Sequence, residues 1–156
     1  MPILVTGATG FLGSRLIRVL INDGQYVIAI ARVSVPDDYV DHPMVHWIVR
    51  DIAKEGLDGL EWPHLDAVVH LAGATLGAGT DEFEFLQANE QTLVRLLQVT
   101  AKHCKHFVFA SSQVVYGNVQ NLQVNEEQPV RADSSAYACS KLNSENWIRW
   151  FQHRYG

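Results

Sequence analysis

The feature that most constrains this chain is the stretch TGATGFLG at positions 6–13, which follows the apolar run ILV at 3–5. Its three glycines, Gly7, Gly10 and Gly13, stand three residues apart. Glycine inside a strand or helix weakens it, so this concentration indicates a turn where the backbone bends sharply or is approached closely. A buried strand, a glycine-rich turn and then a helix predict a site for a dinucleotide pyrophosphate at the helix N-terminus.

Each glycine has an expected role in such a turn. Gly7 allows the tight turn, Gly10 lets the phosphates approach the backbone, and Gly13 lets the helix pack closely on the strand. The spacing is GxxGxxG and not the usual GxGxxG, so a merely tight strand-to-helix turn stays open as an alternative. The placement between a buried strand and an amphipathic helix favours cofactor binding.

Apolar runs alternate with amphipathic stretches along the rest of the chain. Continuous apolar strands separated by helices predict a parallel sheet covered on both faces, which is an α/β, doubly wound, Rossmann-like fold. The predicted strands cover residues 3–5, 26–31, 44–49, 66–73 and 106–112. The predicted helices cover residues 11–23, 81–103 and 135–154. Residues 117–134 are the longest stretch without periodicity, and long loops are often functional.

Each predicted helix has an apolar face at helical spacing. In the first and second helices these faces consist of Leu12, Leu16, Val19 and Leu20, and of Leu86, Leu93 and Leu97. In the last helix, Trp147, Trp150 and Phe151 are expected to form a core face, or a face whose packing partner is absent from this chain.

Length and composition indicate one ordinary globular domain, with 156 residues that are 47% hydrophobic and 19% charged. The net charge is −5 without any run of Lys or Arg, which argues against a nucleic-acid partner or an anionic membrane surface. No apolar run approaches the length of a membrane span, and a signal peptide is not expected. Cys104 and Cys139 form no CxxC pair, which indicates free thiols and a cytoplasmic location. The seven histidines show no metal-ligand spacing, so no metal site is expected.

The end of the second predicted strand bears on the choice between NAD and NADP. An acidic residue there binds the ribose 2′-hydroxyl of NAD, whereas an arginine accommodates the 2′-phosphate of NADP. The chain reads Ala31-Arg32 at that step, with no carboxylate. Arg32 would pair with a phosphate through two N–H groups, and the alternative is a solvated surface arginine. The cofactor is therefore NAD or NADP, with NADP slightly favoured.

Two further residues near predicted strand ends have alternative interpretations. Asp51 would accept a hydrogen bond from the adenine amino group or cap the next turn, and its position favours the first. His70, at the end of the fourth strand, is expected to pack or to form a hydrogen bond and not to catalyse.

A catalytic constellation is predicted from YACSK at 137–141 and ASSQVVYG at 110–117. Tyr137 and Lys141 are four residues apart, so on a helix their side chains share a face. A lysine ammonium favours the ionised form of a neighbouring phenol, which makes it a better base. Ser112, at the carboxyl end of the fifth predicted strand, would hold a carbonyl or alkoxide oxygen that Tyr137 protonates or deprotonates.

Taken together, these pieces make the chain resemble the extended short-chain dehydrogenase/reductase family, the NAD-dependent epimerase/dehydratase group. The matching pieces fall in family order and spacing over essentially the whole chain. They are TGATGFLG, Asp51-Ile52, HLAG at 70–73, Asn89, FVFASSQVVYG at 107–117 and YACSK.

The resemblance implies a Ser112–Tyr137–Lys141 triad and hydride transfer through a bound nicotinamide. It also implies that Asn89 supports the active site, through a water to Lys141. The cofactor-binding residues expected from the motifs and the resemblance together are Gly7, Thr9, Gly10, Phe11, Leu12, Gly13, Arg32, Asp51, Ile52, Leu71, Ala72, Gly73 and Lys141.

Two departures from the family pattern refine this expectation. The dehydratases of the family carry acidic residues just after the catalytic hydroxyl position, where this chain has Gln113 and Val114, so elimination of water is disfavoured. An epimerase acting on a nucleotide-sugar or similar small molecule is favoured. The alternatives are a non-catalytic NAD(P)-binding module and an NADPH-dependent carbonyl reductase. The family also has a C-terminal substrate domain, which is absent from residues 1–156, so the chain is either a fragment of a longer enzyme or a natural short form. The surface that this domain would cover allows self-association into a homo-oligomer.

Overall fold

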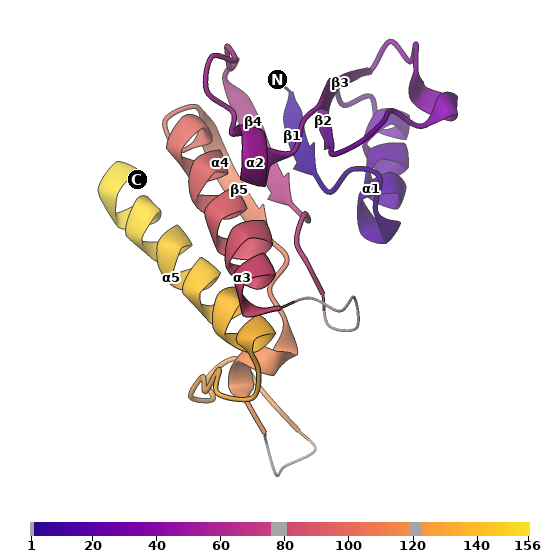
Figure 1. Cartoon of the computed structure of the whole chain (residues 1–156). Coiled ribbons are helices and arrows are strands. Elements are labelled where there is room, and N and C mark those ends of the chain that lie inside the picture. Colours follow the sequence, from indigo (N-terminus) through magenta and orange to yellow (C-terminus); the bar gives the residue numbers. More distant parts are fainter. Residues whose placement is uncertain (1, 76–80, 119–122) are drawn as a thin grey trace.

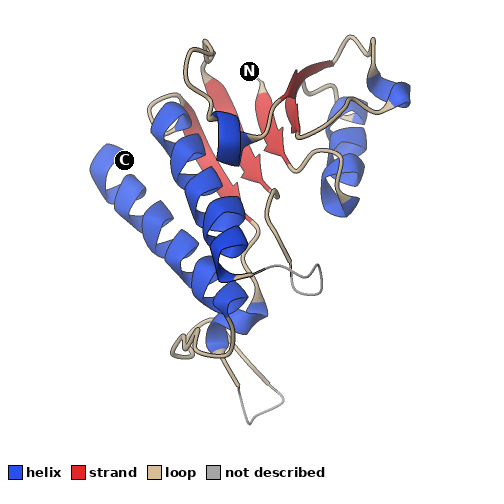
Figure 2. Ribbon diagram, viewed as in Figure 1, coloured by secondary structure: helices blue, strands red, loops and turns tan. Residues whose placement is uncertain are grey.

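The computed structural model describes residues 2–75, 81–118 and 123–156. Among them, five parallel strands form one sheet in the order β3-β2-β1-β4-β5 (Figures 1 and 2). The strands are β1 (Ile3–Thr6), β2 (Val27–Ala31), β3 (Val45–Val49), β4 (Leu65–His70) and β5 (Cys104–Phe109). The order changes direction at β1, which pairs with both β2 and β4. The predicted doubly wound parallel sheet is confirmed.

Helices connect these strands. The α-helices are α1 (Phe11–Asn22), α2 (Ile52–Glu55), α3 (Glu82–Phe85), α4 (Thr92–Thr100) and α5 (Ala136–Tyr155). Two short 3₁₀ helices, η1 (Asp37–Tyr39) and η3 (Gln113–Tyr116), and a π-helix, η2 (Leu86–Gln91), complete the described elements. The longest described helix, α5, begins at a side-chain cap: the Ser135 hydroxyl accepts from the N–H of Ala138 at 3.1 Å, just before Tyr137.

Side chains alternate between the two faces of the sheet, as the strand period requires. On one face, Leu4, Ile28 and Val68 pack with residues of α2 and α4. On the other face, Val5 and Ala29 pack against α1. Phe151 of α5 packs against Leu93 and Leu97 of α4, and the two helices lie side by side in Figure 1. The two buried faces explain why the strands read as continuous apolar runs.

Two strands end earlier than predicted. β4 stops at His70, three residues before the predicted end, and β5 stops at Phe109. The N–H of Leu71 still donates to the carbonyl of Thr6, but the next N–H, of Ala72, donates to the Thr6 hydroxyl. Strand pairing is therefore replaced by a side-chain contact, and residues 71–73 become a loop at the carboxyl edge of the sheet.

The predicted helix 81–103 is interrupted by the π-helix η2. Its wider turns bond residue i to i+5 and shift the faces before and after it. Leu93 and Leu97 are buried, whereas Leu86 is 48% exposed. The prediction that these three leucines share one buried face is therefore wrong for Leu86.

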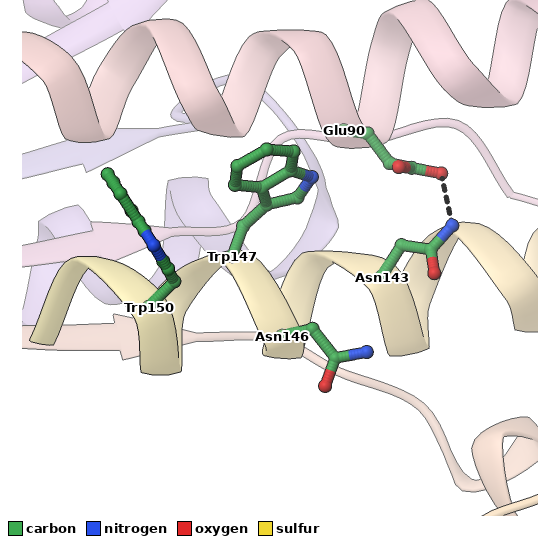
Figure 3. A pocket seen from close by; sticks show the side chains of 5 residues that line it. All are labelled: Glu90, Asn143, Asn146, Trp147 and Trp150. Atoms are coloured by element: carbon green, nitrogen blue, oxygen red, sulfur yellow. Dashed lines mark hydrogen bonds between the residues drawn. The ribbon is translucent and has the colours of Figure 1, made fainter. Parts of the chain in front are cut away.

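The other predicted apolar faces are correct in part. In α1, Leu16 and Leu20 pack on the core around buried Ile17, but Leu12 and Val19 are exposed. In α5, Phe151 is buried, while Trp147 and Trp150 are exposed, so the core interpretation holds for Phe151 and not for the two tryptophans, for which a face without its partner stays a prediction. Trp147 and Trp150 are 40% and 52% exposed, and Trp147 faces the segment that carries Glu90 of η2 (Figure 3).

Candidate active site

The candidate site lies at the carboxyl ends of β1, β4 and β5. Thr6, His70 and Phe109 stand in register across these three strands, each at the last position of its strand. The glycine-rich turn leaves from β1, residues 71–74 leave from β4, and the segment with Ser112 leaves from β5. The change of strand order beside β1 makes this edge the place where doubly wound sheets bind ligands.

The glycine-rich turn is as tight as the sequence indicates. Gly7 has a φ of +66°, and a Cβ there would lie 2.7 Å from the backbone nitrogen of Ala72. A Cβ on Gly13 would lie 2.9 Å from the Cα of Ala8. The N–H of Gly10 donates to the carbonyl of Gly7 at 2.9 Å. The turn therefore accepts no side chain at Gly7 or Gly13, which matches their expected roles.

The N-terminus of α1 is suited to an anion. Its N-cap is Gly10, which offers no side-chain cap, and its first turn holds no acidic residue. Unsatisfied N–H groups and the helix dipole place partial positive charge at such an end. Phe11 and Leu12 are exposed beside it, as is Thr9. The uncapped, exposed N-terminus fits the pyrophosphate of the dinucleotide prediction.

His70 links β4 to the glycine-rich turn. It is 1% exposed, and its Nδ1 forms a 2.6 Å hydrogen bond with the hydroxyl of Thr6, which also accepts from the N–H of Ala72 at 3.3 Å. Its ring stacks on Phe109 at 5.9 Å between centroids. Burial, and secondarily the charge of Lys141, lower the pKa of His70 to about 3. A neutral histidine held between strands confirms the expectation of a packing and hydrogen-bonding role.

Asn89 comes from the π-helix η2 and is buried. Its Oδ1 accepts from the N–H of Ala74 at 2.7 Å, and its Nδ2 donates to the hydroxyl of Ser140 on α5 at 2.9 Å. A Cβ on Gly73 would lie 2.8 Å from the same Oδ1 and 3.7 Å from Nζ of Lys141. Asn89 thus joins the loop after β4 to the helix that carries Tyr137 and Lys141.

Lys141 is buried at the centre of the site, with 6% of its surface exposed. Its Nζ donates to the carbonyl of Ala110 at 2.8 Å and lies 5.9 Å from the ring centroid of Tyr137. Burial lowers the pKa of Lys141. Tyr137 is half-buried, and its ring lies against Phe85 at 5.6 Å between centroids. The two side chains therefore share one face of α5, and Lys141 contacts the chain where it leaves β5.

Ser112 is the N-cap of η3, and its Oγ accepts from the N–H of Val114 at 3.5 Å. It follows Ala110, the residue to which Lys141 is bonded, by two positions. Its neighbour Ser111 donates its hydroxyl to Oε1 of Glu145 on α5 at 2.5 Å. The three predicted triad residues therefore lie on two segments, the exit of β5 and the first turns of α5, that are joined by direct hydrogen bonds.

The predicted cofactor-binding residues Arg32, Asp51 and Ile52 follow β2 and β3 and lie on other segments than the predicted triad. Arg32 is exposed directly after β2, and its role stays a prediction. Asp51 caps α2, with Oδ1 accepting from the N–H groups of Ala53 at 3.1 Å and Lys54 at 3.3 Å. The capping alternative is thus observed, and contact with adenine stays a prediction. The side chain of Ile52 is buried in the core, which leaves its backbone as the part able to meet a cofactor.

A second feature of α5 lies away from these residues. An open depression of about 390 Å³ is lined by Glu90, Asn143, Asn146, Trp147 and Trp150, whose side chains are drawn in Figure 3. Asn143 donates to Oε1 of Glu90 at 3.1 Å, and burial raises the pKa of Glu90.

None of the described helices is both long and apolar enough to cross a lipid bilayer.

Sequence reasoning missed three parts of this arrangement: the Thr6–His70 bond, the Asn89–Ser140 bond and the Ser111–Glu145 bond. One signal for the third was available, because Glu145 stands four residues after Lys141 and so shares its helix face. The other two bonds join residues 64 and 51 positions apart, and no local pattern marks such pairs.

Comparison with known proteins places the site in context. The chain is 28% identical to the UDP-glucose 4-epimerase of Streptococcus mutans over 163 aligned positions, covering 100% of this chain and 49% of that protein. It is 32% identical to UDP-glucose 4-epimerase 4 of Oryza sativa subsp. japonica, covering 97% of this chain and 45% of the relative. The chain therefore spans about half the length of the curated relatives it matches.

Solved structures agree with this likeness. A UDP-galactose 4-epimerase crystal structure superposes with a TM-score of 0.85 at 26% identity, covering 100% of this chain and 53% of that one. The UDP-glucuronic acid 4-epimerase of Bacillus cereus in complex with NAD gives a TM-score of 0.82 at 26% identity, covering 99% and 53%. The model of the NAD dependent epimerase/dehydratase family matches residues 3–156, and this chain belongs to that family.

Proposed function

We propose that this chain is the cofactor-binding part of a nucleotide-sugar epimerase with a Ser112–Tyr137–Lys141 triad. One observation carries the proposal: buried Lys141 shares a face of α5 with Tyr137 and is bonded to the exit of β5, beside Ser112. The likeness to UDP-glucose 4-epimerases supports the substrate class.

The residues present fit a dinucleotide. The α1 N-terminus would hold the pyrophosphate, because it lacks a side-chain cap and the turn before it leaves no room for a Cβ at Gly7 or Gly13. Phe11, Leu12 and the loop 71–73 would line the groove on either side. When bound, the nicotinamide supplies an acceptor and donor of hydride.

The triad residues would manage the proton of the substrate hydroxyl. Tyr137 would take that proton as a general base and return it at the end of the reaction. The ammonium of Lys141 would stabilise the phenolate, because an opposite charge nearby favours the ionised form. Ser112 would donate a hydrogen bond to the same substrate oxygen. Asn89 would hold residue 74 and α5 in place without touching the reacting atoms.

The finer choice of NADP over NAD rests on Arg32. It is exposed directly after β2, where its guanidinium would pair with a 2′-phosphate. Titration of the protein with NADH and NADPH, followed by fluorescence, tests this preference. Tighter binding of NADPH that is lost in Arg32→Ala supports it, and equal or tighter binding of NADH overturns it. The solved relative from Bacillus cereus is in complex with NAD, so equal or tighter binding of NADH would agree with the cofactor of that relative.

Two further expectations complete the proposal. The half-length match to the relatives supports a substrate-binding part outside residues 1–156. The largely exposed side chains of Trp147 and Trp150 on α5 support self-association. Sedimentation of the protein and of a Trp147→Gln, Trp150→Gln variant tests this, and a monomer in both cases refutes it.

The test of the catalytic proposal is Tyr137→Phe in the product of the complete reading frame. With UDP-galactose as the probe, loss of the general base is expected to lower kcat by about 10²- to 10⁴-fold while cofactor affinity stays within about twofold. Full retention of turnover would refute the role of Tyr137. Cofactor binding without turnover in the wild-type protein would instead favour a non-catalytic module.

A further inference from the structure

The hydrogen bond between Ser111 and Glu145 has no part in the chemistry proposed above. The Ser111 hydroxyl donates to Oε1 of Glu145 at 2.5 Å and joins two segments 34 residues apart. Ser111 directly precedes Ser112. Glu145 stands four residues after Lys141, which stands four residues after Tyr137. Tyr137, Lys141 and Glu145 thus follow one another along a single face of α5.

Two contacts from this face reach consecutive residues at the exit of β5. Nζ of Lys141 bonds the carbonyl of Ala110 at 2.8 Å, and the carboxylate of Glu145 bonds Ser111. A segment held at two successive residues has little freedom to slide or rotate against the helix. The next residue, Ser112, then begins η3, which packs against α5. Its place relative to Tyr137 is therefore set by contacts directly before it.

The Glu145 carboxylate is itself fixed in orientation. Its Oε2 accepts from Nη2 of Arg149 at 2.9 Å, and its side chain is 21% exposed against 61% for that of Arg149. Ion pairs this exposed contribute little to stability, so the arginine serves mainly to orient the carboxylate. A hydrogen bond from a hydroxyl to a carboxylate is shorter and stronger than one between two neutral groups. The 2.5 Å distance between Ser111 and Glu145 fits that class of hydrogen bond.

We propose that Glu145 is a positioning residue that holds Ser111 and thereby fixes Ser112 relative to Tyr137 and Lys141. This inference rests on the proposed function, because the role of Ser112 is assigned there. Misplacing a reacting group by about 1 Å costs up to about 10²-fold in rate, so a lost restraint on Ser112 affects the chemical step more than binding.

The test uses Glu145→Ala, Ser111→Ala and the double variant in the product of the complete reading frame, with UDP-galactose as the probe. Each single variant is expected to lower kcat by about tenfold, with KM and cofactor affinity within about twofold. The double variant is expected to be no slower than either single one, because both remove the same contact. Ser111→Thr keeps the hydroxyl and is expected to retain most of kcat. Gln152→Ala, at an exposed position further along α5, is the matched control and is expected to leave kcat unchanged.

The proposal is overturned if the losses of kcat in the two single variants multiply in the double variant. It is also overturned if the single variants keep kcat and lose only thermal stability. Hydrogen–deuterium exchange of residues 110–117 provides a readout that does not need turnover. Faster exchange there in Glu145→Ala, with exchange of β1 unchanged, supports the positioning contact, and equal exchange overturns it. If the wild-type protein shows no turnover, the proposed function fails, while the exchange experiment still decides whether Glu145 holds this segment.

Discussion

Asn89 and Ala74 are joined by two hydrogen bonds, in which the N–H of Ala74 donates to Oδ1 at 2.7 Å and Nδ2 donates to the carbonyl of Ala74 at 3.3 Å. One buried side chain thus satisfies both backbone groups of a residue in the loop after β4. Because the same Nδ2 also reaches Ser140, the amide ties this loop to α5 as well.

Replacing Asn89 by Ala is expected to lower the free energy of unfolding by about 2–4 kcal/mol. The substitution removes three hydrogen bonds and leaves buried polar groups without partners. Urea unfolding followed by circular dichroism measures the change. Asn146→Ala, on the exposed side of α5, is the control and is expected to change stability by less than about 0.5 kcal/mol. Equal effects at the two positions would show that the amide of Asn89 carries no special restraint.

Gly7→Ala is expected to destabilise the protein by about 3 kcal/mol and to weaken NADH binding by at least about tenfold. The φ of +66° disfavours any side chain, and the new Cβ would also meet the backbone of Ala72 at 2.7 Å. Thermal unfolding and fluorescence titration measure the two effects.

Gly24→Ala separates these causes. Gly24 has a φ of +72° but nothing within 4 Å of a Cβ, so only the backbone strain of about 1–2 kcal/mol is expected, with unchanged NADH affinity. If Gly7→Ala and Gly24→Ala give the same loss of stability and the same NADH affinity, the close approach of the Ala72 backbone to Gly7 plays no part.

His70→Gln is expected to flatten the acid side of the stability profile. The pKa of His70 is about 3 in the folded protein against an ordinary value of 6.5, so the unfolded chain binds more protons in that interval. The free energy of unfolding of the wild-type protein therefore falls as the pH falls from 6.5 towards 3, by up to about 1.4 kcal/mol per pH unit from this residue. Urea unfolding at a series of pH values measures the slope. His46→Gln, at an exposed position, is expected to keep the wild-type slope, and an unchanged slope in His70→Gln would contradict the neutral state inferred for this ring.

Lys141→Met tests the burial of the ammonium group. Burial lowers the pKa of Lys141 below 10.5, so between the lowered value and 10.5 the unfolded chain binds more protons than the folded one. The stability of the wild-type protein should therefore rise with pH through that interval, relative to the methionine variant, which does not titrate there. The difference between the two unfolding free energies, measured at pH 7 and at pH 10, should shift in favour of the wild type. Lys54→Met, at an exposed position, should show no such shift; a constant difference for Lys141→Met would mean that the ammonium is well solvated.

Much of the fold follows from local patterns, because strands buried on both faces must be continuously apolar. The run VIAIA became β2 with all five residues buried. The glycine-rich turn was also predictable, because few local structures require glycines at this spacing directly after a buried strand. The YACSK motif likewise placed Tyr137 and Lys141 on one helix face.

Other features depend on contacts between distant residues. The seven-residue spacing of Leu86 and Leu93 suits a regular α-helix, and nothing in it marks the wider turns of η2. The partners of Asn89 are Ala74 and Ser140, on two other segments, and are set by how β4 and α5 approach η2. The capping role of Asp51 is only the second alternative from sequence, and the four-residue helix α2 that it starts is too short to show a helical period.

The π-helix that presents Asn89 makes the length of this segment matter as well as its composition. Each α-helical residue advances about 100° around the axis, and the wider turn of η2 accommodates one residue more than a regular α-turn, so a segment with one residue fewer between 86 and 91 could close into regular α-turns with its two halves in nearly the same orientation. Leu93 and Leu97 would then keep their places in the core, whereas the wide turn that presents Asn89 to Ala74 and Ser140 would be lost. Loss of a single codon in η2 should therefore separate the candidate site from the hydrophobic core, affecting the first and sparing the second.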